Sequence, residues 1–186
     1  MSRAPQSSPS GPEGELHRRA LRPTVRRLRD LAERLTEEIR PLLEKIAERF
    51  FIPGYLMFQI RREAGSTEWH VKLFVRQVGM PPWHLVLLCR IEVALWLLRE
   101  TSLTVAAIAP LVGYADENGL RKLFRNWCDL TPAQARRYLR KVDRQRRGAG
   151  DEALSWSLRV RFHRGEVDSA EMDAVQSYLR SRFSPK

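Results

Sequence analysis

Two stretches of this sequence resemble each other at a distance of fifty residues, and this internal repeat restricts the possible folds more than any other feature. The better-marked copy is Gly113 to Arg136 with the residues that follow it. In the two copies, Lys72, Leu73, Phe74, Met80, Pro82 and Arg90 correspond to Lys122, Leu123, Phe124, Leu130, Pro132 and Arg140. Each copy reads as a short helix, a tight turn with a glycine, and a second helix, which is the order of a helix-turn-helix.

Apolar residues recur at helical spacing through most of the chain, and no alternating strand pattern competes with them. We therefore expect an all-α fold in which two helix-turn-helix lobes are joined by a long linking helix, with a small C-terminal helical appendage. The expected divisions are a Ser-, Pro- and Gly-rich disordered leader at 1–23, an amphipathic helix at 24–36, a domain at 37–142 and a helical pair at 150–186. Within the domain, the first helix-turn-helix is expected at 54–79, the linking helix at 82–100 and the second helix-turn-helix at 103–136.

The charge balance points to a polyanionic partner. The sequence has 33 Lys and Arg against 22 Asp and Glu, for a formal net charge of +11. Nucleic acid is the first candidate and an anionic membrane surface the second. The longest uncharged apolar run, Leu85 to Cys89, is far too short to span a bilayer. Cys89 and Cys128 both lie in apolar helical pattern, so we expect core thiols in a reducing, cytoplasmic setting and no membrane association.

The remaining chemistry-bearing residues do not form a recognisable site. His17, His70, His84 and His163 are scattered, without Cys or carboxylates at ligand spacing. Neither a phosphate-binding glycine loop nor a nucleophile elbow is present in the sequence. We therefore expect no metal, no cofactor and no enzymatic activity. Most of the five tryptophans sit on apolar helical faces and are expected in the core.

The second copy predicts one helix with two distinct faces. Its apolar residues at i, i+3, i+4 and i+7 should be buried, namely Leu120, Leu123, Phe124 and Trp127. The outward candidates for DNA contact are Glu117, Asn118, Arg121, Lys122 and Arg125. Asn pairs well with adenine, and Arg or Lys with the O6/N7 edge of guanine. Arg125, at the far end of the helix, is better placed for phosphate.

The first copy predicts a similar but less basic helix. Leu73, Phe74 and His70 are expected to face the core, and the outward candidates are Thr67, Glu68, Val71, Lys72 and Arg76. Glu68 could accept from cytosine N4, Val71 could touch a thymine methyl, and Lys72 could reach guanine or phosphate. An alternative of equal weight is that Glu68 and Lys72 form only an i,i+4 surface pair.

The second copy closely resembles the C-terminal helix-turn-helix of AraC/XylS-type transcription regulators. The family pattern IA-x-x-x-G-[FY], F-[KR] and [ST]-P-x-x-x-R is matched by Ile108, Ala109, Gly113, Tyr114, Phe124, Arg125, Thr131, Pro132 and Arg136. The segment at 90–98, RIEVALWLL, is similar to the family's linking helix. The resemblance implies a two-lobed domain that places two recognition helices in successive major grooves. By position it implies base readers at Glu68, Val71, Lys72, Asn118, Arg121 and Lys122.

The resemblance leaves several questions open. The first copy is two residues shorter between Gly65 and Phe74 than the second between Gly113 and Phe124, so we expect the second copy to read sequence and the first to position binding. Only about 36 residues precede the matched region, so no small-molecule effector is expected. The N-terminal helix could self-associate, contact phosphate, bind a protein partner or simply extend the fold, and the C-terminal hairpin is a second candidate for partner binding. The alternative function is a helical architectural or interaction module that binds a partner, or DNA without sequence preference.

Overall fold

The computed structural model describes residues 12–128 and 130–146, and the side chains at 12, 13 and 141–146 are outside that description. Eight helices and no strand occur in this part of the chain, which confirms the predicted all-α class. The helices are α1 (Pro12–Ala32), α2 (Arg40–Arg49), α3 (Met57–Glu63), α4 (Glu68–Val78), α5 (Pro82–Glu100), α6 (Val105–Leu111), α7 (Glu117–Cys128) and α8 (Pro132–Arg146). We call α3 and α4 the first pair, and α6 and α7 the second pair. The predicted C-terminal helices at 150–186 lie outside the described residues.

Helix α1 corrects the expected leader. Residues 12–23 were predicted to be disordered, but they form the first half of α1, which ends at Ala32 rather than at 36. Pro23 is exposed within this helix, so its missing N–H removes one hydrogen bond without opening the core. His17, Ala20 and Thr24 are buried on the other side of the helix. The tertiary burial of this side outweighs the low helix propensity that the sequence suggested.

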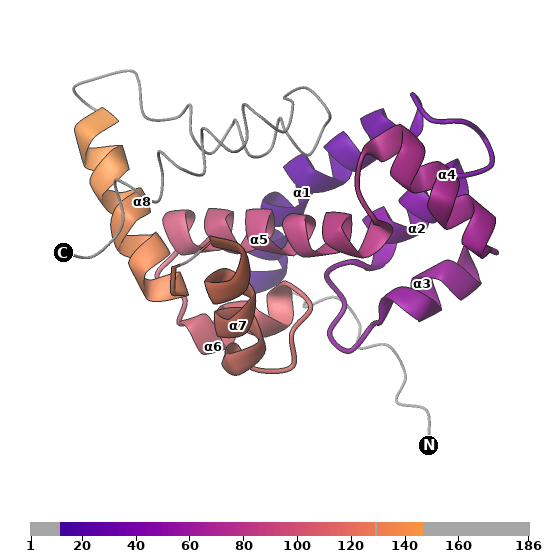
Figure 1. Ribbon diagram of the computed structural model, residues 1–186. Coiled ribbons are helices and arrows are strands. Elements are labelled where there is room, and N and C mark those ends of the chain that lie inside the picture. The colour runs from indigo at the N-terminus through magenta and orange to yellow at the C-terminus, as the bar shows by residue number, and fades with distance from the viewer. Residues whose placement is uncertain (1–11, 129, 147–186) are drawn as a thin grey trace.

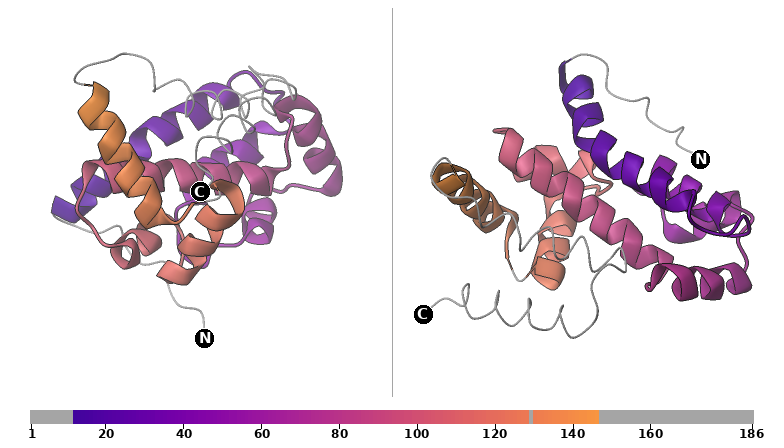
Figure 2. Two further views of the ribbon diagram at one scale, coloured as in Figure 1. Left: turned by 60° about the vertical axis from the view of Figure 1, so that its left-hand side comes forward. Right: turned by 90° about the horizontal axis from the view of Figure 1, so that it is seen from above.

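Helix α5 is the central element of the molecule. It begins with Pro82 in its first turn, after the extended Pro81, and it has the bounds expected for the linking helix. Figure 1 shows α2, α3 and α4 at one end of α5 and α6, α7 and α8 at the other. Viewed from above, α1 lies on one side of α5, and α7 and α8 lie on the other side (Figure 2, right). The continuous core includes the fully buried Val93, Ala94 and Leu97 of α5.

An arginine bridge closes each pair onto the preceding helix. Arg90 donates from Nε to Phe50 O at 2.7 Å and from Nη2 to Tyr55 O at 3.4 Å. Arg136 makes the equivalent bonds near the second pair, to Leu98 O at 3.2 Å and to Leu103 O. In both cases one carbonyl lies at or near the end of the preceding helix, and the other lies two residues before the first helix of the pair.

These bridges revise one detail of the internal repeat. The fifty-residue spacing pairs Arg90 with Arg140, but Arg140 is exposed and Arg136 makes the matching contacts. Positions 136 and 140 are one turn apart on α8, and both lie on nearly the same side of that helix. A fixed sequence offset therefore identifies the correct helix and face but misses the correct turn.

In the described part of the chain, no single helix is long and apolar enough to cross a membrane. Only α4 and α5 taken together pass a test of length and composition, and they meet at a bend of 57°.

Candidate nucleic-acid interface

The turn before α7 is built around close backbone packing. Gly113 has φ of 90°, a conformation that favours glycine, and a Cβ there would lie 2.8 Å from Phe50 O and 2.9 Å from Arg90 Nε. Tyr114 follows, with its ring 5.1 Å from the Arg90 guanidinium carbon, and burial raises the pKa of its phenol. A Cβ at Gly119 would lie 2.6 Å from the Tyr114 ring. The two glycines thus let α7 and its turn approach α5 and the chain after α2.

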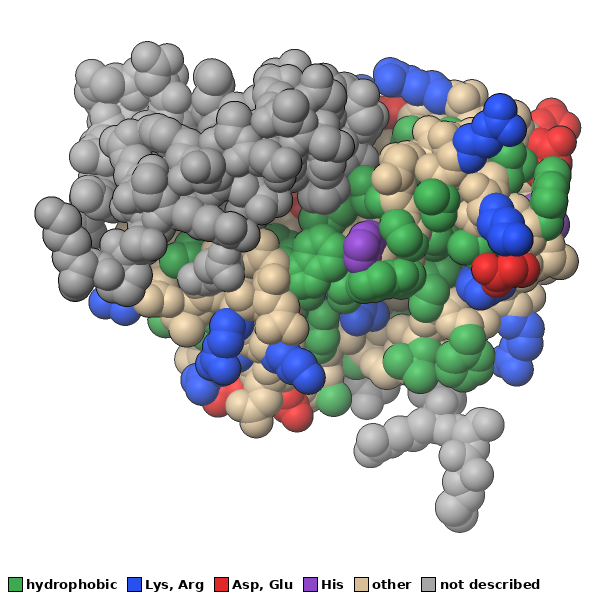
Figure 3. Space-filling view, viewed as in Figure 1, with side chains coloured by type: hydrophobic (Ala, Val, Ile, Leu, Met, Phe, Trp, Pro, Cys, Tyr) green, Lys and Arg blue, Asp and Glu red, His purple; other side chains and the backbone are tan. Residues whose placement is uncertain are grey.

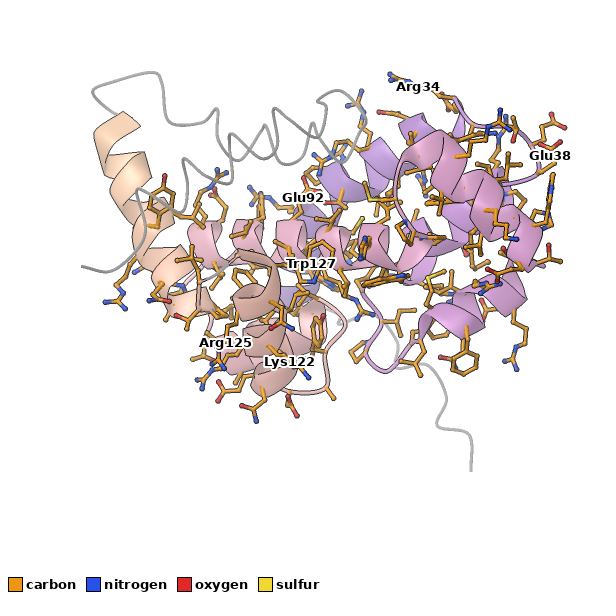
Figure 4. All side chains as sticks on the ribbon, viewed as in Figure 1. Arg34, Glu38, Glu92, Lys122, Arg125 and Trp127 are labelled. Atoms are coloured by element: carbon orange, nitrogen blue, oxygen red, sulfur yellow. The ribbon has the colours of Figure 1, made fainter. Side chains whose placement is uncertain are left out.

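Helix α7 has two faces with sharply different chemistry. Asp116 begins it as the capping residue, because its Oδ1 accepts from the N–H of Gly119 at 2.9 Å. Leu120, Leu123 and Phe124 are at most 5% exposed, and Trp127 is half-buried. The exposed side carries Asn118, Arg121, Lys122 and Arg125, with Glu117 at its edge. Figure 4 shows Lys122 and Arg125 on the outer side of α7 and Trp127 on the side toward α5.

Helix α4 presents a weaker version of the same arrangement. Thr67 caps it, and the His70 ring Nδ1 accepts from the N–H of Thr67 at 3.1 Å. His70 is half-buried beside this cap, so it contributes to the helix end rather than to the deep core, where Phe74 lies. Lys72 and Arg76 are exposed, whereas Val71 is half-buried.

Both predicted acidic contacts are occupied by neighbouring arginines. Glu68 Oε2 lies 3.1 Å from Arg61 Nη2, an ion pair between α3 and α4 that replaces the suggested pair with Lys72. Glu117 Oε2 lies 3.2 Å from Arg121 Nη2 on the same helix, and both side chains are substantially exposed. Surface pairs of this kind contribute little and are easily exchanged. Arg121 can therefore leave Glu117 for a base or phosphate at small cost.

An aromatic cluster lies between the second pair and the start of α5, and sequence reasoning missed it. The Trp83 ring stands edge-on to Trp127 with centroids 6.5 Å apart, and His84 lies 4.9 Å from Trp127. Most of the five tryptophans were expected in the core, but Trp83 is 49% exposed and Trp69 is 56% exposed. Partial burial lowers the pKa of His84. The only sequence signal for the cluster was the position of Trp83 directly after Pro82, where a helix begins.

The molecular surface between α7 and α4 is partly apolar. Figure 3 shows Lys and Arg side chains at the lower left and at the right, with hydrophobic surface and a histidine between them. The exposed charged side chains of α7 and α4 thus flank a mixed apolar centre. A partner that touches both helices would also pass over this centre.

Part of this chain matches a family model and two known proteins. Residues 61–138 match a family model described as a helix-turn-helix domain. An uncharacterized HTH-type transcriptional regulator from Haemophilus influenzae is 34% identical over 67 residues, which make up 36% of this chain but only 22% of that relative. The C-terminal domain of AraT, a response regulator from Geobacillus stearothermophilus, shares the fold with a TM-score of 0.53 and 24% identity, over 56% of this chain and 88% of that domain.

Proposed function

We propose that residues 61–138, which match the helix-turn-helix family model, form a DNA-binding domain of the AraC type, and that the chain regulates transcription by binding duplex DNA at specific sequences. Helix α7 enters one major groove as the main reader of bases. Helix α4 enters the next groove on the same face of the DNA. The HTH-type relative is named as a transcriptional regulator, and this chain spans 22% of its length.

The exposed side of α7 is the observation that carries the proposal. Asn118, Arg121, Lys122 and Arg125 project from the side opposite a tightly buried apolar face, so the helix can enter a groove without uncovering the core. Asn118 has the donor and acceptor that adenine requires. Arg121 and Lys122 are suited to the O6/N7 edge of guanine, and Arg125 to phosphate.

The first pair is suited to a supporting role. Glu68 is engaged by Arg61 and Val71 is half-buried, which leaves Lys72 and Arg76 as the exposed positively charged donors of α4. Two donors of this kind hold a phosphate backbone but discriminate few bases. The 19 residues of α5 extend about 28 Å, which is compatible with recognition helices one DNA turn apart, about 34 Å.

The proposal is tested by selecting bound duplexes from a random pool and then measuring affinity for the selected site. Arg121→Ala and Lys122→Ala should each weaken binding by about 1–3 kcal/mol and relax the preference at one base position. Arg99→Ala, which removes an exposed positive charge from the end of α5, is the matched control and should change affinity little.

Two results would contradict the proposal in different ways. An equal loss on all sequences would assign Arg121 or Lys122 to phosphate rather than to a base. Binding that ignores sequence throughout and falls steeply with salt would instead support the architectural alternative, in which the helix pairs serve as scaffold.

A further inference from the structure

Helix α1 carries a second concentration of positive charge, away from both pairs. We define the arginine stripe as the five exposed arginines of this helix, Arg18, Arg19, Arg22, Arg26 and Arg29. At 3.6 residues per turn, these five positions fall within an arc of about 100°. Arg18 pairs with Glu15 at 2.9 Å, while Arg19, Arg22 and Arg26 have no ion-pair partner among the residues that the structure describes.

The stripe points away from the rest of the molecule because the opposite side of α1 is buried. His17 makes a 2.7 Å hydrogen bond with Leu111 O at the end of α6. Thr24 donates to Glu92 of α5 at 2.9 Å, and Arg27 forms an ion pair with the same carboxylate. Since α1 and α7 lie on different sides of α5 (Figure 2, right), the stripe faces away from the proposed base-reading helix.

The composition of this surface indicates the kind of partner. Apart from Pro23, every exposed side chain described in α1 is charged. A protein interface normally has apolar or aromatic residues at its centre. A membrane-bound amphipathic helix inserts its apolar side, but the apolar side of α1 is already in the core. Phosphate contacts, in contrast, require only charge and hydrogen-bond donors, and guanidinium groups match them well.

We propose that the arginine stripe binds the backbone of a second duplex segment, without sequence preference, while α7 holds the specific site. From Arg19 to Arg29 the stripe extends about 15 Å, a length over which a duplex presents roughly nine phosphate charges. The chain would then join two DNA segments, either separate duplexes or distant parts of one molecule. Only the placement of the first segment rests on the proposed function.

The test uses the full chain, a bead-bound duplex with the selected site, and a fluorescent duplex of unrelated sequence. The loaded protein should capture the fluorescent duplex. The variant with Arg19→Gln, Arg22→Gln, Arg26→Gln and Arg29→Gln should keep its affinity for the selected site within about twofold but lose capture by at least about tenfold. Its slope of log affinity against log salt for unrelated duplex should fall by roughly 3 to 4.

A matched variant separates position from charge. Arg62→Gln, Arg99→Gln, Arg137→Gln and Arg140→Gln remove four exposed arginines outside the stripe, as many as the stripe variant loses, and capture should persist. Circular dichroism and urea unfolding should show that both variants fold as the unmodified chain does. Equal loss in both variants would overturn the proposal, because it would make net charge the cause.

The remaining outcomes are also decisive. No capture by the unmodified chain, or full capture by the stripe variant, would overturn the proposal, and full capture would point to two protein copies that each hold a duplex. Binding of anionic vesicles or an acidic peptide by the stripe, without duplex capture, would reassign it to those partners. A different result would contradict the proposed role of α7 in reading bases. In that case the Arg121→Ala variant would bind the selected site with normal affinity.

Discussion

The first and second pairs share one plan but are held in place differently. In the second pair α6 packs directly on α7, whereas in the first pair α3 packs chiefly on α2 and α4 chiefly on α5. Four of the five exposed large apolar side chains of the described residues lie in or beside the first pair, namely Leu56, Phe58, Trp69 and Val75. The fifth, Trp83 at the start of α5, stands edge-on to Trp127 of the second pair. The second pair is therefore a closed unit with a polar, basic outer side. The first is assembled on its neighbours, and its apolar surface is incompletely covered.

The largest contrast between the pairs is expected at their turn glycines. Gly113→Ala should lower the free energy of unfolding by about 3 kcal/mol or more, for two reasons. The alanine would be strained at a φ of 90°, and its Cβ would clash with Phe50 O, a backbone atom that cannot rotate away. Gly65→Ala should cost only about 1 kcal/mol, because φ is 61° but nothing lies within 4 Å of the added carbon. Urea unfolding measures both changes. Equal losses would mean that the turn of the second pair is not packed as tightly as described.

The arginine bridges provide the next comparison. Arg90→Met and Arg136→Met should each cost about 2 kcal/mol, because both leave two backbone carbonyls without their charged donor. Arg140→Met removes the residue that the fifty-residue spacing would choose, and its exposed side chain should be worth under about 0.5 kcal/mol. Urea unfolding of the three variants measures these losses. A larger loss of stability for Arg140→Met than for Arg136→Met would mean that Arg140, as the fifty-residue spacing predicts, is the counterpart of Arg90.

Sequence periodicity was sufficient to predict the helical class and the two faces of α7. A helix with a single strong apolar stripe buries that stripe, so the opposite side must be exposed. It failed at α1, where Pro12, Gly14 and Pro23 are unfavourable locally, and where packing against α2 and α5 and the His17 hydrogen bond to α6 hold the segment as a helix. It did not locate Trp83, because the pattern of one helix cannot show whether a neighbour covers its first turn. The arginine bridges depend on carbonyls 33–40 residues away in sequence, which no local pattern reveals.

A smaller difference in DNA affinity is expected when the exposed lysines of the two pairs are replaced. Lys72→Ala on α4 should weaken binding by under about 1 kcal/mol, equally on selected and unrelated duplexes, because a phosphate contact carries no sequence information. Lys122→Ala on α7 should instead act mainly on the selected site. Titration of both variants against both duplexes at two salt concentrations measures the distinction. A change of base preference in Lys72→Ala would show that the first pair also reads sequence.

The smallest predicted effect concerns how the second pair is tied to α1. His17 is buried, bonded to Leu111 O and edge-on to the Phe51 ring, and this burial lowers its pKa below the ordinary value of 6.5. The unfolded chain therefore takes up a proton here more readily than the folded one. The contribution of His17 to the free energy of unfolding should be constant above pH 6.5. It should fall as the pH drops from 6.5 through the pKa of His17 in the folded chain.

His17→Gln keeps a side-chain donor for Leu111 O but removes this titration, so its urea unfolding should depend less on pH between about 6.5 and 5. His84 also has a lowered pKa and acts in the same direction, so the difference between the two proteins, not the total slope, reports His17. Identical slopes would mean that His17 is as easily protonated in the folded chain as in the unfolded one. In that case α1 would be held mainly by α2 and α5, and its contact with the second pair would be incidental.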